Sequence, residues 1–370
     1  MRYLVRKGKY YVILYLTERH SMKVIKKLKE KLEIKRYDFK PEIADGPIEN
    51  IENAVFYCVD GIGDIMVASP IIRAILEKCT GSAYFICSPT SRLYIELLDK
   101  QYSNVVIVPV GKKKALTESS IAHTAANIRK QGKIDVIVNG LGRVSPRFAQ
   151  LACLLKPRAV LSAMESAKRT SRPKMVHKSV HYANLLYRRG VSIVDCWGIV
   201  AQMIGCDYNR SLLFPVADIT PERTPYIAVS LLGASWGPIS EKNALHICQA
   251  ISRHYNNDIC LIVSPGIEPM CLSIASTLEN VFVSPIPPTL ELSGAYIKQA
   301  QALVAVCSAP VHIAGAFDTP VLVIRGVERS AWRPVVGCAM EYITNDKNIN
   351  GIDNDKFEAC FAEFINKVGL

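Results

Sequence analysis

The sequence lacks several features that would assign a protein class at once. No apolar run approaches the roughly 20 residues that a membrane-spanning helix needs, and the longest near the start is YYVILYL at 10–16. No small-residue cleavage site follows that run, so we expect no secretory leader. The twelve cysteines include no C-x-x-C pair. We therefore expect a cytoplasmic protein whose cysteines are buried free thiols in a reducing compartment.

Metal-binding patterns are also scarce. His177 and His181 have the i,i+4 spacing of a metal-binding pair, but the sequence offers no third ligand beside them. The pair therefore favours a structural or acceptor-side role, and we expect no metal and no cofactor. Hydrophobic residues make up 49% of the 370 residues and charged residues 21%, which is typical of a globular chain long enough for two domains.

The net charge of +12 is concentrated in one segment. Residues 1–40 hold thirteen Lys and Arg against four acids, so they carry +9 and the remaining 330 residues only +3. Lysines alternate there with apolar residues between Lys23 and Ile34. This pattern suits an interfacial helix on an anionic membrane surface, although a solvated helix packed on the first domain has the same composition. We expect a cytoplasmic enzyme, with the inner face of the membrane as a candidate docking site, and no nucleic-acid partner.

Apolar strand-like runs alternate with helix-like stretches in two halves of similar size, which predicts βαβ units with parallel sheets. The predicted strands are 54–59, 82–87, 104–110, 134–139 and 159–163 in the first half and 226–232, 258–264, 281–285, 302–306 and 320–326 in the second. The stretch 214–225, rich in proline and charge, is the best linker candidate. Two Rossmann-like domains facing a cleft are expected.

The stretch DGIGDIMVASP at 60–70 follows the first of these strands and leads into a helix. Gly61 and Gly63 fit a dinucleotide fingerprint, but Met66 stands where its third glycine belongs, and the second strand ends without an acid for a ribose. A carboxylate at the helix start would also repel a phosphate. A nicotinamide oxidoreductase is therefore the weakest alternative. Asp64 is either a functional acid or a plain N-cap, since Asp is a preferred cap.

The second half carries a different turn, CSAPVHIAGAFDTP at 307–320. Ser308 is placed to cap a helix that begins near Pro310. Free amides at such a helix start, together with the helix dipole, favour an anion. His312 lies one turn further along and either faces the same cleft or is a packed helix histidine.

These motifs together resemble glycosyltransferase family 9, the ADP-heptose:lipopolysaccharide heptosyltransferases. The resemblance covers roughly residues 54–345, with matched order and spacing. The matching segments are Gly63-Asp64-Ile65, Ser69-Pro70, Gly233-Ala234-Ser235, Pro265-Gly266-Ile267-Glu268, the stretch 307–316 with Pro320, and Trp332-Arg333-Pro334. The resemblance implies the GT-B fold, with two Rossmann-like α/β domains facing a central cleft.

The resemblance also implies a function and its residues. The activity is inverting transfer of a heptose or related sugar from a nucleotide sugar, ADP-heptose above all, to a lipopolysaccharide-core or related glycan or lipid-linked acceptor. Asp64 takes the part of the general base. The implied donor-binding residues are Ser235, Glu268, Cys307, Ser308, Ala309, His312 and Arg325. The implied acceptor-binding residues are Gly61, Gly63 and Arg143, the last within the basic stretch 142–147.

We expect the chain to divide into five parts. It consists of a basic N-terminal arm (1–53), an acceptor domain (54–214), a linker (215–225), a donor domain (226–350) and a C-terminal helix packing back across both domains (351–370).

The sequence departs from the family pattern at the donor side. Cys307 stands where the family has an acid, Ala309 where it has a glycine, and no lysine follows the 233–235 turn closely. Arg325, Arg329 or the helix amides alone could neutralise a pyrophosphate instead. Two alternatives therefore stay open beside transfer: a degenerate family member that binds without turnover, and a nucleotide-sugar enzyme such as an epimerase.

Overall fold

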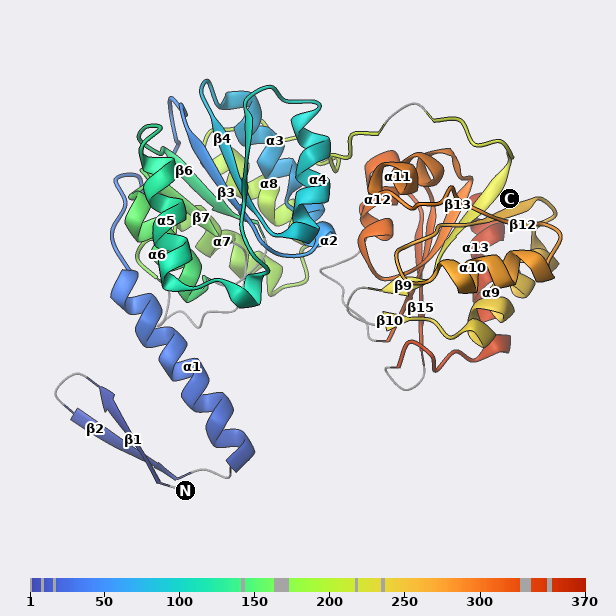
Figure 1. Cartoon of the computed structure of the whole chain (residues 1–370), viewed down its shortest axis with the longest axis horizontal. Helices are drawn as coiled ribbons and strands as arrows, with labels where there is room; N and C mark the ends of the chain where they lie inside the picture. Colours follow the sequence, from blue (N-terminus) through green and yellow to red (C-terminus); the bar gives the residue numbers. More distant parts are fainter. Residues whose placement is uncertain are drawn as a thin grey trace.

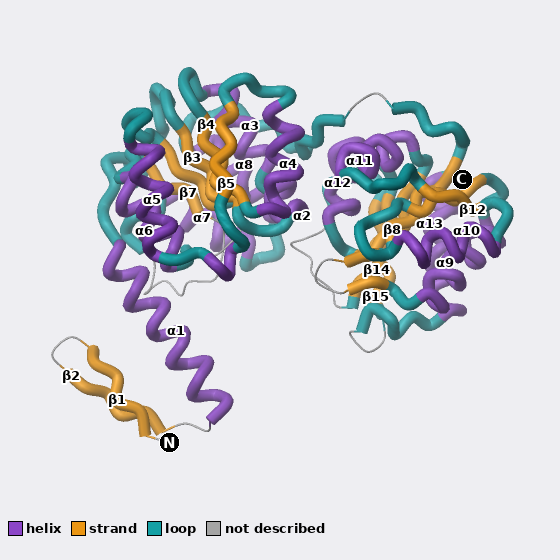
Figure 2. Tube along the Cα trace, viewed as in Figure 1, coloured by secondary structure: helices purple, strands orange, loops and turns teal. Residues whose placement is uncertain are grey.

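The structure is a computed structural model that describes residues 2–7, 10–15, 18–140, 144–162, 173–216, 219–233, 237–326, 334–344 and 348–370. Two α/β domains lie side by side, and an N-terminal hairpin and helix extend from the first of them (Figure 1). In each domain helices cover a central parallel sheet (Figure 2). Within the described residues no helix has both the length and the apolar character that crossing a bilayer requires.

The first domain is built on a five-stranded parallel sheet in the order β5-β4-β3-β6-β7. Its inner strands are buried on both faces, as expected of a sheet with helices on both sides. The strands are β3 (Ala54–Cys58), β4 (Ala83–Cys87), β5 (Val105–Pro109), β6 (Val136–Asn139) and β7 (Ala159–Ser162). The helices are α2 (Ile62–Val67), α3 (Ser69–Lys78), α4 (Pro89–Asp99), α5 (Glu118–Arg129), α6 (Pro146–Leu155), α7 (Lys178–Tyr187) and α8 (Ile193–Met203), with a 3₁₀ turn, η1, at Lys113–Ala115.

The second domain repeats this plan with six parallel strands in the order β12-β11-β8-β13-β14-β15. The strands are β8 (Tyr226–Ser230), β11 (Asp258–Leu261), β12 (Val281–Val283), β13 (Ala302–Val306), β14 (Val321–Arg325) and β15 (Ala339–Ile343), with a small antiparallel pair of β9 (Leu232–Gly233) and β10 (Gly237–Pro238). The helices are α9 (Glu241–His254), α10 (Glu268–Thr277), α11 (Leu290–Gln299), α12 (Ala309–Phe317) and α13 (Asn354–Val368).

Strand order reverses beside the first strand of each sheet, and ligands of open α/β sheets bind outside the carboxyl ends at such a switch point. In the first domain the reversal lies between β3 and β6, and in the second between β8 and β13. The ten strands predicted from apolar runs are all present. β15 and the β9–β10 pair were not predicted, because two- to five-residue strands with half-exposed faces leave no continuous apolar run.

The predicted arm is not one unit. β1 (Arg2–Lys7) and β2 (Tyr10–Tyr15) form a hairpin, and α1 (Glu18–Tyr37) follows it. The end of α1 packs on α6, and Ile34 and Tyr37 contact the core of the first domain. Ile48 and Ile51 are fully buried in that core. The segment 38–53 therefore belongs to the first domain, because its apolar side chains complete the domain's core.

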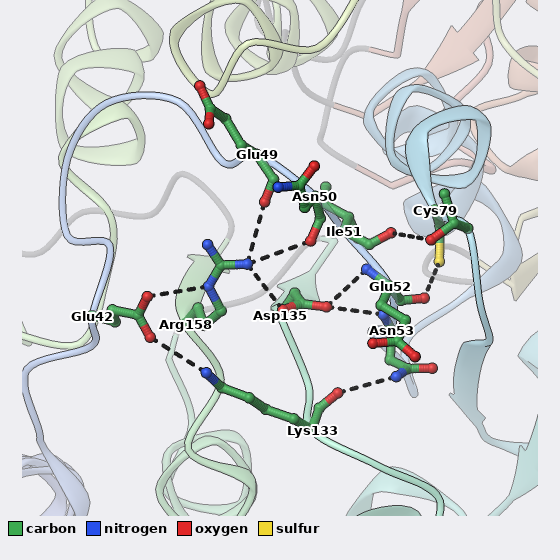
Figure 3. Close-up of polar contacts among 11 residues, drawn as sticks. Glu42, Glu49, Asn50, Ile51, Glu52, Asn53, Cys79, Lys133, Asp135 and Arg158 are labelled. Carbon is green, nitrogen blue, oxygen red and sulfur yellow. Dashed lines mark hydrogen bonds and ion pairs between the residues drawn. The ribbon is translucent and has the colours of Figure 1, made fainter.

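A polar network fastens this segment to the sheet (Figure 3). The Asp135 carboxylate accepts the N–H groups of Glu52 and Asn53 at 2.8 and 3.0 Å. Its other oxygen pairs with Arg158 at 3.1 Å, and Arg158 also pairs with Glu42. The network lies at the amino ends of β6 and β7, the edge opposite the switch point, so we assign it a structural role.

The two domains share one apolar core. Phe214 contacts the ring of Tyr94 in the first domain and that of Phe317 in the second. The backbone of Leu213 is held by α3 and α4, because its N–H donates to Ser69 Oγ at 2.8 Å and its carbonyl accepts from the Tyr94 hydroxyl. The chain thus leaves the first domain through a buried crossing at 212–214 before the linker.

The expectation for the C-terminal helix is wrong. Phe357, Phe361 and Phe364 on α13 lie in the second domain's far-side core, against α9 and β15. The helix packs within the second domain because its apolar face matches the sheet face that α11 and α12 leave open.

Candidate active site

The residues singled out from the sequence gather at the carboxyl ends of the two sheets. Gly61, Gly63 and Asp64 follow β3, the stretch 307–312 follows β13, and Glu268 begins α10 after β11. Arg325 is the last residue of β14. Ser235, Arg143, Arg329, Trp332 and Arg333 lie outside the described residues. The location of the described ones agrees with the ligand-binding edge of open α/β sheets.

Asp64 is not an N-cap. Gly61 occupies the N-cap position of α2 and Asp64 is the third helical residue, whose Oδ2 accepts the Gly61 N–H at 3.1 Å. The plain N-cap interpretation is therefore wrong, and the carboxylate closes half of a capping box instead. Burial raises the pKa of Asp64 above its ordinary value, and the nearby Asp60 carboxylate raises it further. A carboxylate with a raised pKa is a better proton acceptor.

Asp60 is paired with Lys113, which lies in the 3₁₀ turn η1 of the loop after β5. The Asp60 side chain is 17% exposed and that of Lys113 47%. Lys112 and Lys114 beside it are exposed as well. Three lysines therefore lie at the carboxyl edge of the first sheet, close to the turn that carries Asp64. Sequence reasoning missed both Asp60 and this loop, although the run GKKK directly after a predicted strand was a usable signal.

Ser308 precedes α12, as predicted, but its side chain does not cap the helix. Its hydroxyl contacts the carbonyls of Val306 and Leu232, each at 3.0 Å, and makes no cap hydrogen bond. The expectation of a Ser308 side-chain cap is therefore wrong, because the extended backbone at Ser308 turns the hydroxyl back toward the strands. Pro310 has no N–H, and the Val311 N–H donates to the Ser308 carbonyl at 3.2 Å. The helix dipole and the Ala309 N–H are therefore what could favour an anion at this helix start.

His312 is a buried helix residue with only 7% of its surface exposed. Burial, with the positive charge of Arg325 added, lowers the pKa of His312 to about 4, so the ring is neutral at pH 7. Arg325 is itself 1% exposed and forms an ion pair with Glu341 at 3.1 Å. A cation therefore lies near the start of α12 but is embedded in protein. Glu341 was missed, because β15 was not predicted.

Glu268 stabilises the turn in which it lies by a hydrogen bond to the backbone. Its Oε2 accepts the N–H of Gly266 at 2.6 Å, and Gly266 has a φ of +90°. Only glycine adopts that backbone region readily. Among the residues that the structure describes, no three His, Cys, Asp or Glu side chains are grouped to hold a metal ion.

The two halves of the site touch. α2 packs directly on α12, and the backbone of Gly63 lies against His312 and Ala309. Asp64 and the start of α12 are therefore brought together from opposite domains. A carboxylate of raised pKa and an anion-favouring helix start, side by side, can accept a proton and hold a leaving phosphate.

Comparison with solved structures identifies the architecture. The chain superimposes on a glycosyl transferase family 9 protein from Veillonella parvula with a TM-score of 0.63, at 12% identity, over 88% of this chain and 99% of that one. The chain has the GT-B fold. The Escherichia coli heptosyltransferase WaaC, solved with ADP, matches with a TM-score of 0.57 at 14% identity, over 84% of this chain and 99% of that one.

A different activity also occurs on this architecture. The UDP-GlcNAc 2-epimerase of Methanocaldococcus jannaschii matches with a TM-score of 0.51 at 15% identity, over 85% of this chain and 93% of that one. No protein-family model and no curated protein sequence matches the chain. At these identities the likeness establishes the fold, and function has to be argued from the site.

Proposed function

We propose that this protein is an inverting glycosyltransferase that moves a heptose or a related sugar from a nucleotide sugar to a glycan acceptor. ADP-heptose is the proposed donor and a lipopolysaccharide-core or related glycan the proposed acceptor. One observation carries the proposal: Asp64, a carboxylate of raised pKa, lies beside the uncapped start of α12 in a fold shared with heptosyltransferases.

The donor is proposed to bind the second domain. Its phosphates lie at the start of α12, near Ser308 and Ala309, with Glu268 and Ser235 as further proposed donor-binding residues. Cys307 cannot supply the carboxylate that the family has there, and Arg325 is proposed to supply the positive potential in place of the missing lysine. The support is the uncapped helix start and the buried cation near His312.

The acceptor is proposed to bind the first domain, near Gly61, Gly63 and Arg143. The exposed Lys112, Lys113 and Lys114 favour an acceptor with acidic or phosphorylated groups. In the proposed reaction the Asp64 carboxylate takes the proton of an acceptor hydroxyl. The hydroxyl oxygen then bonds to the anomeric carbon of the donor sugar as the bond from that carbon to the phosphate oxygen breaks. The nucleoside diphosphate leaves, and the configuration at the anomeric carbon is inverted.

An epimerase is the second candidate, and the likeness to UDP-GlcNAc 2-epimerase favours it. A binder without turnover is the third, because Cys307 departs from the family acid. Single-turnover assays separate the three. With labelled ADP-heptose and a lipopolysaccharide-core acceptor, we expect label in the acceptor. Release of an epimerised sugar from UDP-GlcNAc without acceptor would favour the second candidate, and saturable ADP binding with neither product the third.

We further propose that α1 docks the enzyme on an anionic membrane surface. On the described part of the helix, Val24 is 36% and Leu32 47% exposed, and four lysines around them (26, 27, 29 and 31) are exposed as well. A lysine-rich helix with exposed apolar side chains suits acidic lipid headgroups. Replacing the four lysines by glutamate should abolish binding to vesicles containing phosphatidylglycerol and leave ADP binding intact. Unchanged vesicle binding at low salt would refute this proposal.

A further inference from the structure

The backbone conformation of Gly63 does not itself require a glycine. It lies inside α2, where glycine costs about 0.5–1 kcal/mol relative to alanine, and its φ is not in the left-handed region. The constraint comes from the other domain. A Cβ at position 63 would lie 3.1 Å from His312 Cδ2, 3.5 Å from Ala309 Cα and 3.6 Å from Ala309 N.

The space above Gly63 is therefore filled by α12. The nearest of these distances is shorter than an ordinary van der Waals contact, so not even a methyl group fits without movement. A sugar or a phosphate is much larger than a methyl group. In this arrangement neither an acceptor sugar nor a donor phosphate can lie between Gly63 and the start of α12, and both have to bind beside the contact.

The contact also lies next to the reactive group. Gly63 precedes Asp64 in the chain, and both are in the first turn of α2. Any displacement of α12 away from Gly63 therefore changes the distance between Asp64 and whatever α12 holds. His312, which lies against Gly63, is neutral and buried, so this part of the contact is packing rather than charge attraction.

We propose that Gly63 is a positioning residue, whose missing side chain lets the second domain close onto the turn that carries Asp64. The closed distance between Asp64 and the donor is then set by direct contact of Gly63 with Ala309 and His312. The catalytic consequence rests on the proposed transferase function, whereas the closure itself does not. This interface role takes the place of the acceptor contact proposed for Gly63 above, because α12 covers the position that such a contact would need.

The test uses Gly63→Ala and a matched control. At Gly140, on the same edge of the first sheet, a Cβ would also meet its nearest neighbour at 3.1 Å, but that neighbour is Ala68 of the same domain. Gly140→Ala thus crowds the residue that ends α2 from within the first domain, without meeting α12. We measure kcat, acceptor KM and ADP affinity for both full-length variants, together with amide hydrogen exchange of the peptide 307–317.

For Gly63→Ala we expect kcat to fall about three- to tenfold, since α12 has to shift by only part of the 1 Å misplacement that can cost about a hundredfold. ADP affinity should stay within about threefold, and exchange in 307–317 should accelerate. Gly140→Ala should match the wild type in all of these. A raised acceptor KM with unchanged kcat, or wild-type exchange at 307–317 in Gly63→Ala, would overturn the proposal. Absence of transfer by the wild type would refute the proposed function alone, because hydrogen exchange still decides the closure.

Discussion

The two domains share one strand order but have opposite chemistry at their switch points. After β3 the first domain places an acid in the first turn of a helix, and that acid accepts the N–H of its own N-cap residue. After β13 the second domain has no acid in the helix start, and the serine before it turns its hydroxyl back to the strands. The first helix start thus has a side-chain acceptor for one of its own N–H groups, and the second receives no cap hydrogen bond from its serine.

The difference between these two helix starts gives domains of the same architecture two kinds of site, one with an acid and one without. Each helix follows the first or fourth strand of its sheet and presents the positive end of its dipole at the carboxyl edge. A carboxylate in the first turn opposes the preference for an anion in the first domain, and the second domain has no acid in the first turn of α12. In the second domain, neutral His312 and buried Arg325 leave the preference for an anion in place.

The variant Asp64→Asn tests most directly whether the acid of the first domain acts as a base. The amide oxygen can still accept the Gly61 N–H, so the melting temperature should stay close to that of the wild type. Turnover should fall by a factor of roughly 10²–10⁴, the usual worth of a positioned general base. Transfer assays at saturating acceptor and thermal unfolding measure the two effects. A wild-type transfer rate would contradict the assignment of Asp64 as the base.

Asp60→Asn is the matched control for that variant. It keeps Asp64 but removes the Asp60 charge, which together with burial raises the Asp64 pKa. Because the base acts deprotonated, activity should fall as pH drops through the Asp64 pKa. The acid limb of the pH–rate profile should therefore move to lower pH in Asp60→Asn. Movement to higher pH would show that Asp60 does not act on Asp64 in this way.

Arg325→Met tests the buried cation of the second domain. Removal of the guanidinium leaves the Glu341 carboxylate, 18% exposed, without its ion-pair partner. Breaking a buried pair on one side costs about 3–5 kcal/mol. The double variant Arg325→Met/Glu341→Leu should recover most of that loss, as measured by urea denaturation. If the single and double variants are equally unstable, the pair does not carry the effect. ADP affinity should fall in both variants.

His312 makes the second domain sensitive to acid. Its pKa falls from the ordinary 6.5 to about 4 in the folded chain. Between those values the unfolded chain binds a proton that the folded chain does not, so the free energy of unfolding decreases as pH falls through this window. The loss should reach roughly 3 kcal/mol by pH 4. His312→Gln should show a flatter stability profile from pH 7 to 4.5, and an equally steep one would contradict this reasoning.

The smallest effect is expected at the rim between the domains. Lys100, the residue after α4, pairs with Glu291 of α11 at 2.8 Å, with side chains 61% and 28% exposed. An exposed pair contributes about 0.2–1 kcal/mol and is screened by salt. Lys100→Ala should therefore change stability and kcat little, in contrast to Gly63→Ala at the inner contact. A tenfold loss of kcat would show that the pair of Lys100 and Glu291, rather than the contact at Gly63, controls the closure of the domains.

Several features of the site were predictable because they are local. Asp64 follows a buried strand within six residues, and Ser308 follows another within two, so the end of each strand placed them at the carboxyl edge of a sheet. The details failed where a neighbouring backbone decided them. The Asp64 carboxylate caps Gly61 instead of serving as N-cap, and the Ser308 hydroxyl contacts Leu232, which is distant in sequence.

By itself the sequence determined the two α/β halves, their strands and the turns that carry the polar residues, because apolar periodicity and turn chemistry act between residues close in the chain. Only the tertiary structure decided which residues meet across the chain. The contact of Gly63 with His312, the pairing of Asp60 with Lys113 and the burial of Arg325 beside Glu341 depend on how sheets and domains pack. Such contacts leave no periodic signal, since each partner occupies an unrelated position in its own local pattern.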